Sequence, residues 1–153
     1  MPANEQPTID AQYWPTVMYQ TFILRAVDCP NPAAEFDATS EAMAQVGRYG
    51  VVFKSAGNDM QSSVRLQIFR AEPDRQSGEV WDEEFTAEIS VPTMRLRLDT
   101  SDGGLVGDVI EVESNSFNIH ILCKGRQEAA NQVGRIPVFE RGPEKWLVRL
   151  WPA

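Results

Sequence analysis

Apolar and polar residues alternate through most of the stretch from residue 79 to residue 124, and this alternation constrains the fold more than any other feature. The apolar sets begin at Phe85, Met94, Ile110 and Phe117, and the residues between their members are mostly charged or polar. A period of two residues is typical of a strand with one buried face and one wet face. Such a sheet needs a second layer on its apolar side, so the stretch predicts part of a layered β structure.

Four further segments are predicted as strands, at 17–27, 50–56, 62–72 and 146–151, because they are rich in β-branched and aromatic residues. The turn residues at 57–59 predict that the second and third of these segments form a hairpin. Pro92 predicts a bend at which the chain crosses between sheets. We therefore expect a mainly β protein, an antiparallel β-sandwich of about eight strands with one short helix. A closed barrel is the alternative architecture.

The short helix is expected within residues 33–50, where the period of two breaks down. Asp37 or Thr39 can cap its start, and Ala42, Met43 and Val46 form an apolar stripe at helical spacing. Residues 124–135 lack an apolar face and predict a long loop, with one helical turn at 128–132 as an alternative.

A length of 153 residues favours one domain with a real core. Residues 1–12 are polar and contain prolines, so we expect a flexible N-terminal lead-in followed by a single β-sandwich domain over 13–153. Both faces of the C-terminal strand are apolar, which predicts a central position or a contact beyond the domain. Leu147 and Trp151 are the residues through which a homodimer could form.

The composition excludes several classes of protein. No apolar run approaches the roughly 20 residues of a membrane helix, and the N-terminus does not have the pattern of a secretory signal, so we expect a cytoplasmic protein. Cys29 and Cys123 are too few for a disulfide framework or a zinc site, and both are expected to be reduced.

The charge is unevenly distributed along the chain. The net charge is −8, and residues 74–113 hold eleven acids against three bases, so the entire excess lies in this block. An acidic protein is a poor nucleic-acid binder, because binding DNA or RNA needs basic surface. The block is either a solvated face or a negative patch that attracts a basic protein partner.

The candidate partner-binding residues follow from this charge, with Trp81 as an aromatic anchor beside them. The acidic members of this set are Asp82, Glu83, Glu84, Glu88, Glu111 and Glu113.

No pattern of catalytic residues is found, and we expect neither an enzyme nor a cofactor. His120 is the single histidine and is expected to be a surface or half-buried residue. The loop at 99–108 holds Asp99, Ser101 and Asp102, but Ile110 stands where a calcium loop needs its glutamate. We expect a hairpin turn there and no metal site, with a weak calcium site as the alternative.

Several short landmarks resemble the bacterial competence-protein-J family, small inhibitors of a DNA-entry nuclease. The matching segments span roughly residues 18–122 and are Met18-Tyr19-Gln20-Thr21-Phe22, Gln45-Val46-Gly47, Gly50-Val51-Val52-Phe53, Val64–Ile68, Trp81, Ile89-Ser90-Val91-Pro92, 107–112 and Phe117-Asn118-Ile119. The resemblance implies an intracellular protein that binds and blocks a nuclease without catalysing a reaction.

The sequence therefore predicts a non-catalytic acidic binding protein, an inhibitor or immunity-type partner of a basic enzyme such as a nuclease. Two alternatives stay open. One is a β-sandwich module that binds a small ligand or calcium, and the other is a structural subunit.

Overall fold

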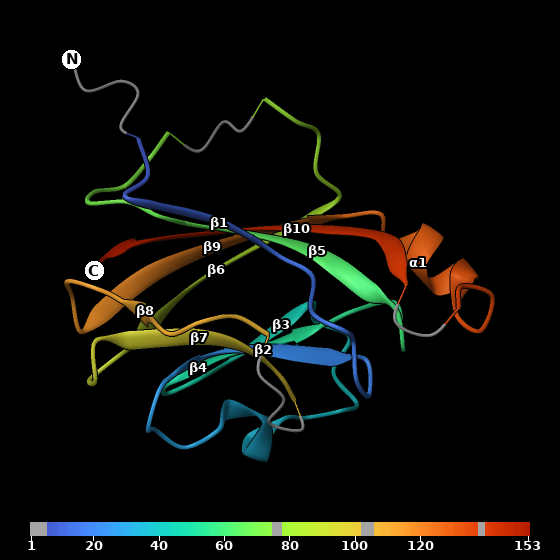
Figure 1. The fold of residues 1–153 in the computed structure, drawn as a ribbon, viewed down its shortest axis with the longest axis horizontal. Helices are drawn as coiled ribbons and strands as arrows, with labels where there is room; N and C mark the ends of the chain where they lie inside the picture. Colours follow the sequence, from blue (N-terminus) through green and yellow to red (C-terminus); the bar gives the residue numbers. More distant parts are fainter. Residues whose placement is uncertain (1–5, 75–77, 102–105, 138–139) are drawn as a thin grey trace.

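The computed structural model describes residues 6–74, 78–101, 106–137 and 140–153, and over these residues ten strands form two five-stranded sheets that face each other (Figure 1). Sheet A has the order β1 (Ile9–Tyr13), β5 (Gln61–Ile68), β10 (Arg141–Pro152), β9 (Ser116–Lys124) and β6 (Glu83–Ser90). Sheet B has the order β3 (Ala44–Gly47), β4 (Gly50–Lys54), β2 (Thr21–Ala26), β7 (Arg95–Thr100) and β8 (Ile110–Glu111). The predicted β-sandwich is confirmed.

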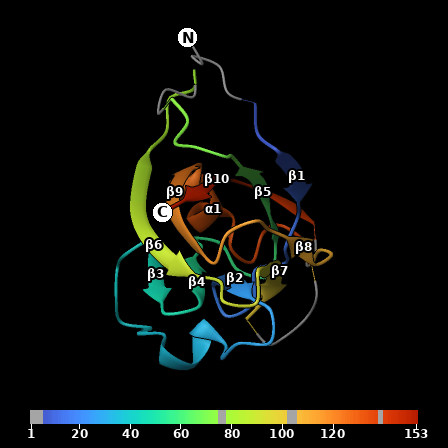
Figure 2. The ribbon, with the colours of Figure 1, turned by 90° about the vertical axis from the view of Figure 1, so that its left-hand side faces the viewer.

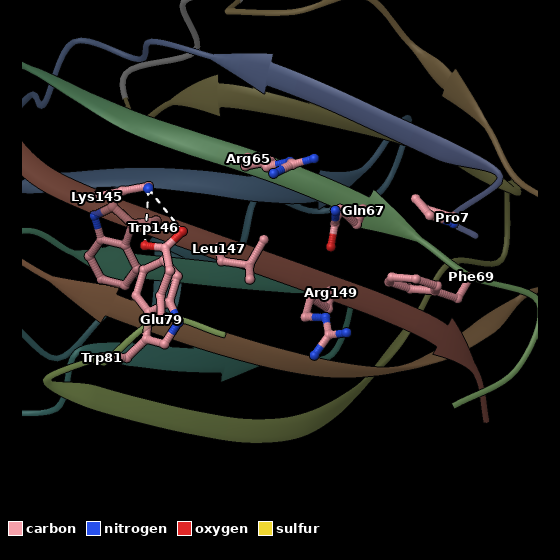
Figure 3. A pocket seen from close by; sticks show the side chains of 10 residues that line it. All are labelled: Pro7, Arg65, Gln67, Phe69, Glu79, Trp81, Lys145, Trp146, Leu147 and Arg149. Atoms are coloured by element: carbon pink, nitrogen blue, oxygen red, sulfur yellow. Dashed lines mark hydrogen bonds and ion pairs between the residues drawn. The ribbon is translucent and has the colours of Figure 1, made fainter. Parts of the chain in front are cut away.

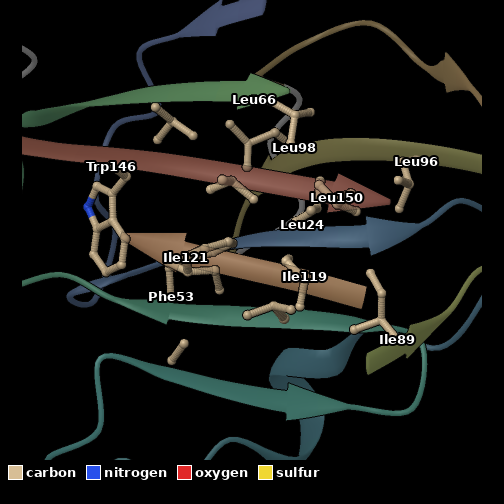
Figure 4. Packing of buried hydrophobic residues seen from close by; sticks show 14 of the residues in the cluster. Leu24, Phe53, Leu66, Ile89, Leu96, Leu98, Ile119, Ile121, Trp146 and Leu150 are labelled. Atoms are coloured by element: carbon tan, nitrogen blue, oxygen red, sulfur yellow. The ribbon is translucent and has the colours of Figure 1, made fainter. Parts of the chain in front are cut away.

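The core lies between the sheets and is built from the alternating apolar residues (Figure 4). Phe22 and Phe53 pair across β2 and β4 and stack with ring centroids 4.7 Å apart. Trp146 of β10 meets both rings edge-on, at 5.5 and 5.4 Å. The two contacts of Trp146 join the sheets, bury large apolar surfaces and help to fix how the sheets stack.

Over the described strands the chain crosses between the sheets four times, and two of these crossings bear on the sequence predictions. The chain leaves sheet A after β6 and enters sheet B at β7, which confirms the predicted bend at Pro92. Met94, expected to face the core, lies in this connection with a φ of 55° and is partly exposed. The predicted hairpin of 50–56 with 62–72 is wrong, because β4 belongs to sheet B and β5 to sheet A. The residues at 57–59 do turn the chain, but their turn leads to the other sheet.

The helix predicted within residues 33–50 is also wrong. A short 3₁₀ helix, η1 (Pro32–Glu35), is followed by a turn in which Asp37 Oδ1 accepts hydrogen bonds from the backbone and hydroxyl of Thr39. Strand β3 then pairs with β4 through a tight connection between Gly47 and Gly50. Cross-strand pairing therefore overrides the helical spacing in this segment. The one α-helix of the described residues is α1 (Arg126–Gln132), where a loop or a single helical turn was expected.

The first and the last of the described strands both belong to sheet A. Residues 9–12 form most of β1 and pair with β5, so the expectation of a flexible lead-in was wrong for them. Strand β10 lies at the centre of the sheet, parallel to β5 and antiparallel to β9, as the apolar character of both its faces predicted. Leu147 and Trp151 are buried within the chain, so neither offers the exposed apolar contact expected for a homodimer.

The connection between β5 and β6 lies on the outer side of sheet A, as far as its described parts at 69–74 and 78–82 show (Figures 1 and 2). The outer face of this sheet is therefore not a simple solvated surface. Among the described helices, none is long and apolar enough to cross a membrane.

Candidate functional site

Strand β6 forms an open acidic edge of the sandwich. It is the last strand of sheet A and pairs only with β9 among the described strands. The side chains of Asp82, Glu83, Glu84 and Glu88 are all exposed there. We call these four residues the acidic edge. Charged residues at a sheet edge also discourage pairing with other chains, so solubility alone would account for part of this pattern.

Three members of the acidic edge have partners within the chain. Asp82 Oδ2 accepts a hydrogen bond of 3.1 Å from the backbone N–H of Gly125, just before α1. Glu83 Oε2 lies 2.6 Å from Arg126 Nε, and Glu84 Oε2 lies 2.9 Å from His120 Nε2. Glu88 makes no ion pair with any described residue. The edge is therefore less negative than its sequence suggests, and Glu88 presents its charge most freely.

The two remaining predicted acids, Glu111 and Glu113, lie away from the acidic edge. Glu111 ends β8, which is the outermost strand of sheet B, and Glu113 follows it in the connection to β9. Figure 2 shows β6 and β8 on opposite sides of the sandwich. The six predicted acids therefore do not form one surface.

Trp81 lies next to the acidic edge but is partly buried. Lys124 Nζ and Lys145 Nζ lie over its ring, 5.1 and 5.7 Å from the centroid. Both ammonium groups also bind Glu79, at 2.6 and 3.2 Å. Hydrogen bonds from Lys124 and then Lys145 hold the pKa of Glu79 below its usual value. Two lysines from the C-terminal third of the chain therefore neutralise part of the negative block that the sequence predicted.

A buried carboxylate at this end of the sandwich has no counterpart in the sequence predictions. Glu144 is only 1% exposed, and its carboxylate accepts four hydrogen bonds of 2.6–3.0 Å. The donors are Ser55 Oγ, the Ala56 backbone N–H, Ser62 Oγ and Trp146 Nε1. A buried charge is tolerated only when it is paired or fully hydrogen-bonded. Glu144 shares the inward face of β10 with Trp146 and Val148, and this alternation was the signal that could have revealed it.

Arg126 connects the buried Glu144 to the acidic edge. Its Nη1 lies 3.6 Å from Glu144 Oε2 and donates a 2.7 Å hydrogen bond to the carbonyl of Lys54, while its Nε binds Glu83. A shallow depression beside α1 is lined by Asp82, Glu83 and Arg126. The arrangement fixes the start of the acidic edge to the core.

The other sequence candidates have structural roles. His120 is buried, which corrects the expectation of a surface or half-buried residue. Asp99 is buried as well, and Arg97 donates hydrogen bonds of 2.7 and 3.2 Å to its two oxygens. Asp102 lies outside the described residues. Among those described, no group of three or more metal-binding side chains gathers.

The chain matches no known protein family and none of the curated proteins. Its fold, however, matches solved structures over nearly their whole length. One is ComJ of Bacillus subtilis, an inhibitor of the DNA-degrading activity of NucA, with 10% identity, a TM-score of 0.65, and coverage of 99% of this chain and 100% of that one. Another is the crocagin biosynthetic gene J product, with 15% identity, a TM-score of 0.59, and coverage of 95% and 99%.

The likeness to ComJ confirms, at the level of the fold, the resemblance that the sequence showed over residues 18–122. It extends that resemblance to the first and last strands. At such low identity the comparison shows a shared fold, and it assigns no binding residue.

Proposed function

We propose that this protein is a non-catalytic inhibitor or immunity-type partner of a basic, DNA-degrading nuclease. The observation that carries the proposal is the acidic edge on a fold shared end to end with a nuclease inhibitor. A nuclease must present basic surface to the phosphates of DNA, so an exposed row of carboxylates can compete for that surface.

We assign the contact to the acidic edge, with Trp81 at its border, and leave Glu111 and Glu113 outside it. Glu84 and Glu88 point to the same side of β6 because they are four residues apart in a strand. The free side of an edge strand is also accessible to a partner along its length. Two thiols that form no disulfide, Cys29 and Cys123, suit a reducing compartment, and we place the protein in the bacterial cytoplasm.

The test is a plasmid-degradation assay in which the purified protein is titrated into DNA-degrading nucleases. These are NucA, several nucleases with a high isoelectric point, and any nuclease that the protein retains from a bacterial lysate at low salt. We expect stoichiometric inhibition of at least one nuclease, weakening as salt rises. If the protein inhibits and retains none of them, the proposal is overturned.

A matched pair of variants locates the surface. Glu84→Lys with Glu88→Lys changes the net charge by four units at the acidic edge, and Glu111→Lys with Glu113→Lys makes the same change on the opposite side. The first pair should abolish inhibition, and the second should reduce it only slightly. Equal effects of the two pairs would show that net charge, and not this surface, governs binding. The Glu88→Lys single variant leaves the contact of Glu84 with His120 intact and separates binding from folding.

A further inference from the structure

A hollow of about 260 Å³ lies on the outer face of sheet A, away from the free side of β6 (Figure 3). Side chains of β5 and β10 form its floor. Trp81 and Glu79 stand at one end, and Phe69 and Pro7 stand at the other. Ligand sites for drug-sized molecules usually measure about 300–1,000 Å³, so this outer-face hollow suits a smaller molecule.

Arg149 is the unusual member of the hollow. The residue is only 7% exposed, yet its Nε and Nη1 atoms are buried without a hydrogen-bond partner among the described residues. Its guanidinium carbon lies 5.3 Å from the centre of the Phe69 ring, a contact that offers no acceptor to the N–H groups. Buried donors in proteins are nearly always paired, so two unpaired ones on a permanent cation require an explanation.

Basic side chains outnumber acidic ones in the lining of the hollow, although the whole protein is acidic. Three bases and one acid line it, in a chain with a net charge of −8. Arg65 is paired with Asp10, and Lys145 is paired with Glu79. Arg149 has no ion pair with a described residue. Burial lowers the pKa of its guanidinium, and the negative charge of Asp74 acts in the opposite direction.

We propose that the outer-face hollow binds a small molecule through a phosphate or carboxylate group, with Arg149 as the main donor. An anion there would accept hydrogen bonds from the unpaired N–H groups of Arg149. The amide of Gln67 on the floor and the rings of Phe69 and Trp81 at the two ends would contact the body of the ligand. This site shares Trp81 with the border of the acidic edge, but its anion-binding group is Arg149 and not the acids of that edge, so the proposal does not rest on the nuclease partner.

The direct test is an NMR titration of the arginine Nε–H resonances with inorganic phosphate in one series and acetate in another, both at constant ionic strength. We expect the Arg149 resonance to shift in a saturable way, and the stronger of the two series identifies the preferred anion. Absence of a saturable shift in both series would overturn the proposal, and so would equal shifts of all exposed arginines, which would indicate nonspecific binding.

Variants supply the second test. Arg149→Gln should weaken binding about tenfold or more, because it removes a charge-assisted hydrogen bond. Arg48→Gln makes the same change at an exposed position of the β3–β4 turn and should leave binding unaltered. Should Arg149→Gln fail to fold, Lys145→Gln at the exposed border should still fold and should bind several-fold more weakly. Unchanged affinity in a folded Arg149→Gln would contradict the assignment. If that variant does not fold, unchanged affinity in Lys145→Gln would contradict it.

Discussion

Trp146 Nε1 donates a hydrogen bond of 2.7 Å to Glu144 Oε1, and both side chains lie inside the protein with one residue between them in β10. The bond places a carboxylate next to the aromatic cluster of the core. The same carboxylate links β10 to β4, β5 and α1, because its other partners come from or adjoin these elements.

We therefore expect Glu144→Ala to destabilise the protein by about 3–5 kcal/mol, because several buried donors and Arg126 lose their acceptor. Glu144→Gln keeps the shape and part of the bonding, and should cost about 1–3 kcal/mol. Urea unfolding followed by tryptophan fluorescence measures both changes. Glu140→Ala, at an exposed position just before β10, should change stability by no more than about 0.5 kcal/mol.

Gly125 occupies a position that other residues cannot take without strain. Its φ is +80°, and a Cβ there would lie 2.4 Å from the carbonyl oxygen of Pro143. Gly125→Ala should cost about 2–4 kcal/mol, from the left-handed backbone and from the contact with a backbone atom. Gly134 has a φ of +77° but open space around it, so Gly134→Ala should cost only about 1 kcal/mol. Equal losses in the two variants would refute the steric part of this argument.

Acid should weaken the pairing of β1 with β5 through Asp10. The side-chain hydrogen bond from Arg65 holds the pKa of Asp10 below its ordinary value of 3.8, with a smaller contribution from Gln67 and an opposing one from burial. Because the pKa is lower in the folded state, the stabilisation is complete above about pH 4 and disappears as the pH falls through the folded value. The pair is well exposed, so its contribution at neutral pH is below about 1 kcal/mol.

The measurement is the melting temperature of the wild type and of Asp10→Asn at pH 7 and at pH 2.5. The wild type should melt slightly higher at pH 7, and the difference between the two proteins should shrink at pH 2.5. A difference that is undiminished in acid would show that the charge of Asp10 is not its cause.

The two thiols should differ in reactivity. Burial raises the pKa of Cys123 well above its usual range, with the negative charge of Glu144 adding to the shift, while Cys29 is partly exposed in a loop. A thiolate is the reactive form, so a thiol reagent at pH 8 should modify Cys29 and leave Cys123 untouched until urea is added. Peptide mass spectrometry identifies the labelled site. Cys29→Ser should abolish the fast labelling, and equally fast labelling of Cys123 in the folded protein would contradict the burial argument.

Most strands could be predicted from the sequence because a half-buried strand leaves its period of two in the residues themselves. The segments around Ile121, Leu98 and Val148 illustrate this. The two strands that were missed, β1 and β3, are short, and their own residues indicate a polar lead-in and a helix. Pairing with β5 and with β4 decides their conformation, and pairing depends on residues far away in the sequence.

The candidate site was predictable only in its residue types. The carboxylates of the acidic edge were named from sequence, but the charges that meet them were not. Arg126 and His120 are 43 and 36 residues away from the acids that they contact at Glu83 and Glu84. The sequence likewise could not show that the guanidinium of Arg149 is buried without a described hydrogen-bond partner, because the groups that cover it, such as the Phe69 ring, come from other segments of the chain.

By itself, the sequence determined that this chain is a β-sandwich with a strong excess of acid, because alternation and net charge are properties of neighbouring residues and of composition. Only the tertiary structure decided which strands pair, that the acids divide between opposite edges, and that Glu144 and Arg149 are buried. Those features arise from contacts between distant segments, and the free energy of such contacts is set by burial and distance in space and not by position along the chain.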